Sequence, residues 1–231
     1  MINARTLAIC AVGTVLLTYR IEAQSLAQYR NFELGSDLAS VSTLAGVTSS
    51  AVKTLHQRPA VLQDLEWRPS LWLNGSTATS ADPVEQVLFS FCNDRLFRVV
   101  VDYARDRTEG MTGADLIEAI STVYGTPLPR TSRAGRVASR VETESGSPVA
   151  RWGDSEHAVV LYQTSSYGAS YRLVVTDVQL DSLARKAESQ AVRLDDQEGP
   201  AKEAARQKQE RDDGRAAAAT ARAANKGAFR P

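Results

Sequence analysis

The chain has 231 residues, with 27 basic and 27 acidic side chains, so its formal charge at neutral pH is zero. This balance argues against a general nucleic-acid-binding protein, which normally carries a basic surplus. Two cysteines and two histidines are too few for a disulfide-stabilised scaffold or a structural zinc site. The 43% of hydrophobic residues is enough for a real core in one domain or two small ones.

Residues 1–23 have the pattern of a secretory signal peptide. Arg5 precedes an apolar run from Leu7 to Leu17, and a plausible cleavage site follows Ala23. The run is shorter than the roughly 20 residues that a membrane span needs. A buried N-terminal helix and a lipid anchor at Cys10 are the alternatives. We expect an exported protein, either periplasmic or extracellular.

Two predicted helices share one pattern at an offset of 79 residues. In each, three apolar residues spaced three apart form one stripe of a helix, which ends at a glycine. The stripes and their stops are Leu38, Val41, Leu44 and Gly46 in the first, and Ile117, Ile120, Val123 and Gly125 in the second. The start signals are Gly35-Ser36-Asp37 and Gly110-Met111-Thr112-Gly113, which supply side chains that accept bonds from the first turn.

Each predicted helix is followed by three predicted strands in the same order. The pairs are 65–68 with 150–153, 87–91 with 158–162, and 97–101 with 171–175, at offsets of 85, 71 and 74. Chance similarity is the alternative, because apolar stripes are common. The pattern predicts an α+β fold with two tandem units, 24–108 and 109–180, each a helix on a three-stranded antiparallel sheet. The units could join edge to edge or pack face to face.

The first hairpin is predicted from side-chain parity. If Val87, Phe89 and Phe91 share a face with Phe97, Val99 and Val101, then Phe91 pairs with Phe97 across an odd-length loop at Asn93-Asp94-Arg95. A two-residue turn would instead place Phe91 opposite Leu96 and split the apolar face. Cys92 is then a small residue at the hairpin rim, and it has no cationic neighbour in sequence that would activate it as a nucleophile.

This pattern resembles small secreted α+β modules of the BamE/SmpA-type outer-membrane assembly proteins and of the tandem-repeat β-lactamase inhibitor proteins. The matching features are the helix from Gly35 to Gly46 and the hairpin from Val87 to Leu96. The resemblance covers residues 32–103 and, more loosely, 110–177. It implies noncatalytic protein binding and brings no catalytic residues.

Two charged segments lie outside the repeated pattern. Arg130, Arg133, Arg136 and Arg140 form a candidate anion-contact cluster, with a solvated loop as the alternative.

Residues 181–231 are rich in alanine and in charged residues. Leu183, Ala187, Ala191 and Leu194 recur there at helical spacing and are expected to dock on the folded part. Beyond Gly199-Pro200 we expect a solvated helix or disorder, without the leucine heptads of a coiled coil, and with a basic end suited to weak contact with lipid headgroups or cell-wall anions.

The sequence offers little catalytic chemistry. His56 and His157 lack metal-ligand neighbours at helical spacing, and there is no nucleophile elbow, phosphate loop or dinucleotide fingerprint. Asp64 and Glu66 share one face of a strand, but Arg58 and Arg68 nearby favour ion pairing over acid–base work. We predict no cofactor and no catalytic residues.

Three functional hypotheses follow. The leading one is a noncatalytic module that binds an unidentified protein, with a role in envelope assembly. The second is an inhibitor or sensor of a secreted hydrolase, and the third is an enzyme of unrecognised type. Candidate protein contacts are Trp67, Trp72 and Trp152, since aromatic anchors often dominate interfaces, together with Asn93, Asp94 and Arg95.

Overall fold

The computed structural model describes residues 25–69, 82–129, 146–164, 169–228 and 230. Within them the fold is α+β, built on one antiparallel sheet of seven strands in the order β3-β4-β5-β6-β9-β8-β7. The strands are β3 (Val52–His56), β4 (Leu62–Trp67), β5 (Val84–Cys92), β6 (Arg95–Ala104), β7 (Ser147–Gly153), β8 (His157–Gln163) and β9 (Ala169–Asp177). A small hairpin, β1 (Gln28–Tyr29) with β2 (Phe32–Glu33), precedes them, and a short 3-10 turn, η1 (Ser49–Ala51), leads into β3.

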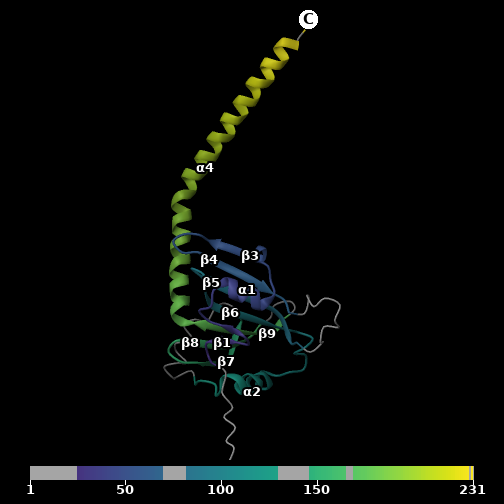
Figure 1. Ribbon diagram of the computed structural model, residues 1–231, viewed down its shortest axis with the longest axis vertical. Coiled ribbons are helices and arrows are strands. Elements are labelled where there is room, and N and C mark those ends of the chain that lie inside the picture. The colour runs from purple at the N-terminus through teal and green to yellow at the C-terminus, as the bar shows by residue number, and fades with distance from the viewer. Residues whose placement is uncertain (1–24, 70–81, 130–145, 165–168, 229, 231) are drawn as a thin grey trace, which may run out of the picture.

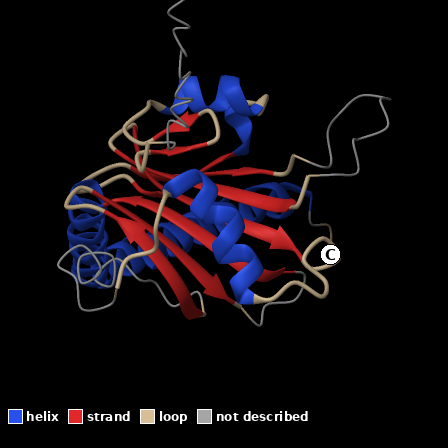
Figure 2. Ribbon diagram, turned by 90° about the horizontal axis from the view of Figure 1, so that it is seen from below, coloured by secondary structure: helices blue, strands red, loops and turns tan. Residues whose placement is uncertain are grey.

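Helices α1 (Leu38–Ala45) and α2 (Gly113–Tyr124) form where the spacing predicted them. Asp37 caps α1 by accepting a 2.8 Å bond from the Ser40 amide, and Thr112 with Asp115 forms a capping box at the start of α2. Gly46 ends α1 in the left-handed region, at a φ of 65°. Figure 2 shows a helix lying across the strands of the sheet.

The main core lies between these two helices and one face of the sheet. Alternate strand residues point into it, as the pleat requires. It contains Val41, Leu116 and Ile120 from the helices, and Val87, Phe89, Val99, Val101, Val159, Leu161, Leu173 and Val175 from the strands. As the alternation predicted, Val87, Phe89 and Phe91 share this face with Val99 and Val101. Phe97 was expected on the same face but lies on the opposite one.

The predicted loop of the first hairpin is wrong. Phe91 pairs with Leu96, and the chain turns in two residues, Asn93 and Asp94, at φ values of 48° and 64°. Both central residues therefore adopt the left-handed conformation of the tightest hairpin turns. A bulge after Ser90 restores the register, so the apolar face is not split.

The two halves of the chain contribute to one continuous sheet, which is joined by β6 and β9. Separate three-stranded sheets are not observed among the described residues, and β3 adds a fourth strand to the first half. Leu65 pairs with Phe89 in the first half, and Ala150 pairs with Leu161 in the second. Since Leu65 and Ala150 are equivalent positions, Phe89 of β5 corresponds to Leu161 of β8, an offset of 72 residues. The offset predicted from the sequence for this pair of strands is 71 residues.

The opposite face of the sheet carries the long helix α4 (Val178–Ala228). A second apolar cluster joins them, with Leu62, Cys92 and Phe97 from the sheet and Ala184 from the helix. Figure 1 shows α4 running along the body and then continuing past it, so that the C-terminus lies at the far end of the molecule.

Candidate functional site

The start of α4 is fixed by the strand before it. Strand β9 ends at Asp177 and α4 begins at Val178, with no intervening loop. The Asp177 carboxylate accepts bonds of 2.9 and 2.8 Å from the amides of Gln179 and Leu180, and so satisfies two of the free N–H groups of the first turn. The direction of the helix is therefore set by the sheet.

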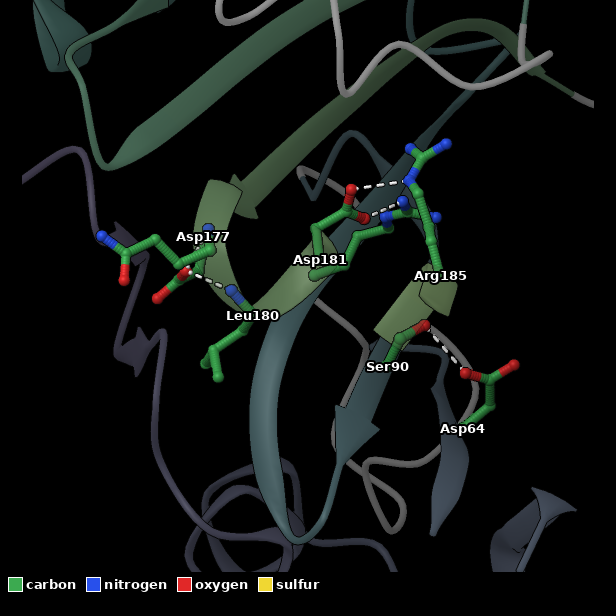
Figure 3. Close-up of polar contacts among 8 residues, drawn as sticks. Asp64, Ser90, Asp177, Leu180, Asp181 and Arg185 are labelled. Carbon is green, nitrogen blue, oxygen red and sulfur yellow. Dashed lines mark hydrogen bonds and ion pairs between the residues drawn. The ribbon is translucent and has the colours of Figure 1, made fainter. Parts of the chain in front are cut away.

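A buried ion-pair cluster holds the first turns of α4 against the sheet (Figure 3). The side chain of Asp181 is 2% exposed, and it pairs with Arg98 of β6 and with Arg185 one turn later. The Arg185 Nε lies 2.7 Å from the Asp181 Oδ2. Each oxygen of the carboxylate thus has a guanidinium partner, which is the condition for burying an ionised group at tolerable cost.

Beside this cluster, Ser90 of β5 donates a 2.8 Å hydrogen bond to the Oδ1 of Asp64 on β4 (Figure 3). Burial raises the pKa of the Asp64 carboxyl, and the bond from Ser90 partly offsets this effect. The Asp64 carboxylate lies in a structural contact on the helix side of the sheet.

Small side chains let α4 lie close to the strands. Ala184, Ala187 and Ala191 are buried and Leu194 is partly buried, so a docked stripe exists. Leu183, which the sequence placed in that stripe, is 55% exposed. The prediction that Leu183 docks on the sheet is therefore wrong. The buried face of α4 instead contains Asp181 and the alanines, because the helix lies so close to the sheet that small side chains are favoured.

A second contact holds α4 four to five turns further on. Glu198 lies 2.9 Å from Arg58 of the β3–β4 loop and 2.9 Å from Lys202 on the next turn. The hydrogen bonds from Arg58 and Lys202 lower the pKa of Glu198 to about 2. Between the two contacts, His56, Arg58 and Asp195 line a polar groove of about 210 Å³.

Beyond Pro200 the helix leaves the body. All of residues 201–228, here called the arm, are exposed. At 1.5 Å per residue the arm is about 42 Å long. Its contacts are ion pairs along its own surface, such as Arg206 with Glu203 at 2.9 Å, and they support the helix by small amounts each. No helix of the described chain is both long and apolar enough to cross a membrane.

The end of the arm is basic. Arg215, Arg222, Lys226 and Arg230 follow the last acidic residue, Asp213. Arg215, Arg222 and Lys226 are therefore cations on a helix whose side chains face solvent on every side, and Arg230 lies beyond the end of that helix.

The predicted tryptophan contacts have different surroundings. Trp152 is 1% exposed and donates a 2.9 Å hydrogen bond to the Gly125 carbonyl at the end of α2, so it belongs to the core. Trp67 is partly buried and packs on Phe32, with ring centroids 5.3 Å apart. Trp72 lies outside the described residues, as do Arg130, Arg133, Arg136 and Arg140 and the predicted leader.

The hairpin tip is exposed, but two of its side chains make contacts within the fold. The Asn93 side chain accepts a 3.0 Å bond from the Val61 amide, and Asp94 accepts a 3.0 Å bond from the Leu38 amide at the start of α1. Arg95 is exposed beside Gly35. The tip thus ties α1 and the β3–β4 loop to the sheet.

The residues weighed for catalysis are not brought together. His56 faces α4, while His157 begins β8 with its Nδ1 3.6 Å from Asp154. Glu66 pairs with Arg68 at 2.7 Å, as expected, whereas Arg58 pairs with Glu198. Among the described residues, no three His, Cys, Asp or Glu side chains are grouped closely enough to hold a metal ion.

Sequence reasoning missed the residues that anchor α4. Arg98 and Asp181 are 83 positions apart, so no local spacing links them. The available signal was Asp177, an aspartate at the boundary between an apolar strand and a helical pattern. No family model, curated protein or solved structure matches the chain.

Proposed function

We propose that this chain is an exported, noncatalytic binding protein with a role in envelope assembly, and that it presents its helical arm to an acidic protein surface. The observation that carries the proposal is the contrast within α4. Asp181 at the base of the helix is buried and doubly paired, whereas every residue from 201 to 228 is exposed.

This contrast supports binding because a fixed base reduces the freedom that a partner must remove. A segment that folds only on binding has a lower affinity, because part of the binding free energy offsets the conformational entropy that the segment loses. Here the arm is already helical, and its basic end suits an acidic partner, for which charge raises the association rate. The resemblance to noncatalytic secreted modules agrees with this role.

We also propose that the body consists of two tandem units, 24–108 and 109–180. The pairing register supports this division. Val100 pairs with Val174, while Val99 pairs with Val175 and Val101 with Leu173, as expected for two related strands that meet at a local two-fold axis. A single unit of about 70 residues would be only marginally stable by itself, and duplication would give it a larger sheet and a larger core.

The hydrolase-inhibitor hypothesis draws less support from the geometry. It uses the hairpin tip and exposed tryptophans, but Asn93 and Asp94 make contacts within the fold and Trp152 is buried. Within the described residues, the arm makes no comparable contacts with the folded body.

Photo-crosslinking of the full chain in envelope extract tests the proposal. A photoreactive residue at Ala218, in the arm, is compared with one at Thr54, an exposed position of β3. We expect a discrete protein adduct from position 218 alone, which disappears in R215Q/R222Q/K226Q and at about 0.5 M salt, where charge screening is strong. Equal adducts from both positions, adducts with lipid or polysaccharide alone, or no adduct would each overturn it.

A further inference from the structure

A cavity of about 320 Å³ lies between α2, the β1–β2 hairpin and the end of β6. It is separate from the arm and from the groove beside α4. Most of its wall is apolar, and its lining includes Tyr29, Tyr103, Met111, Leu116, Ile120 and Tyr124. Its volume is within the range of small-molecule sites, which combine apolar walls with a few polar groups.

Two phenol groups belong to the polar part of the lining, together with Arg30, Arg107 and Thr108. The hydroxyls of Tyr29 and Tyr103 have no hydrogen-bond partner among the described residues, whereas the Tyr124 hydroxyl donates a 2.9 Å bond to the Gln28 carbonyl. Burial raises the pKa of Tyr103 to about 12 and raises that of Tyr29 as well. Both phenols therefore stay protonated at neutral pH and can donate to an acceptor in the cavity.

The charges at the cavity mouth are balanced. The Arg30 guanidinium forms a two-bond pair with Asp82, at 2.9 and 2.8 Å, and lies 5.5 Å from the centre of the Tyr29 ring. Arg107 lies 3.5 Å from Asp106. A ligand with its own charge would have to compete with these pairs and lose its hydration, so the site favours an uncharged molecule.

We propose that this cavity binds a small uncharged, mainly apolar molecule that carries a hydrogen-bond acceptor, such as a ketone or ester oxygen. The apolar part contacts Leu116 and Ile120, and the acceptor oxygen receives hydrogen bonds from Tyr29 and Tyr103. The chain would thus carry a small-molecule site in addition to its arm.

Binding is tested with N-phenyl-1-naphthylamine, an uncharged dye that brightens in apolar surroundings. Ala119 lines the cavity from an exposed position of α2, so A119W fills the mouth without disturbing the core. Ala114 is also exposed on α2 but does not line the cavity, which makes A114W the matched control. We expect A119W to weaken dye binding at least about tenfold and A114W to leave it within twofold, with both folded by circular dichroism. Equal binding by the two variants would overturn the site.

The chemical class is tested by displacing the dye with acetophenone, ethylbenzene and benzoate, which are similar in size. Acetophenone should displace it at least about threefold better than ethylbenzene, and benzoate should be weakest. The preference for acetophenone should vanish in Y29F/Y103F, while ethylbenzene displaces the dye as before. A preference for benzoate, or no difference between acetophenone and ethylbenzene, would contradict the proposed class.

Discussion

Replacement of Asp181 by alanine should detach the base of α4 from the sheet. The Asp181 side chain is 2% exposed and that of Arg98 is 18% exposed, so the variant leaves the Arg98 cation largely buried without its carboxylate. The Nε of Arg98 already lacks a hydrogen-bond partner within the described part of the chain. Removing one member of a buried pair typically costs about 3–5 kcal/mol, and we expect D181A to lower the free energy of unfolding by that amount.

The assay is urea denaturation followed by circular dichroism, with two comparisons that isolate the cause. R185A should cost only about 0.2–1 kcal/mol, because the Arg185 side chain is 43% exposed and water replaces much of its interaction. The double variant R98M/D181L removes both charges and should recover most of the stability lost in D181A. If D181A costs less than R185A, or if the double variant is no better than D181A, the buried pair does not anchor the helix.

Three further predictions concern single features. Burial raises the pKa of the Cys92 thiol, so it should resist Ellman's reagent at pH 8 in the folded protein and react fully in denaturant; rapid labelling of folded protein would refute this. Carboxyl NMR should give Glu198 a midpoint of about 2, well below the ordinary 4.5, so its contact with Arg58 persists on acidification until that range and is lost below it; a midpoint near 4.5 would mean that no such contact forms. W152F should cost about 1–3 kcal/mol through the lost bond to Gly125 and the lost ring volume, and an unchanged urea midpoint would exclude a core role.

The elements with local signals were predictable. In α1 and in α2 the apolar stripe lies within a few turns of its own glycine stop, and both helices form where expected. Leu44, the last residue of the first stripe, is nevertheless 56% exposed. Strand β3 was missed because its central residues are exposed and show no apolar alternation. The hairpin turn was misjudged because parity assumes an unbroken ladder, and the bulge after Ser90 breaks it.

The candidate site was predictable only in outline. The alanine-rich composition indicated a solvated helix or disorder after Pro200, and the described residues form a solvated helix up to Ala228. Ala187, Ala191 and Leu194 of the predicted stripe do face the body, and only Leu183 was wrongly included. Hydrophobicity alone does not reveal that Asp181 is paired with an arginine of a distant strand. Long-range ion pairs of this kind depend on the tertiary fold and leave no periodic trace in the sequence.

Hydrogen–deuterium exchange of the full chain tests most directly whether α4 has an anchored base and a free arm. Backbone amides protected by tertiary packing exchange slowly, whereas those of a solvated helix open readily. We predict slow exchange across residues 181–198 and exchange at least about a hundredfold faster across 203–226, with the change near Pro200. Uniform protection along the helix would mean that the arm is already packed against something, and fast exchange throughout would mean that it has no fixed base; either result would contradict the account.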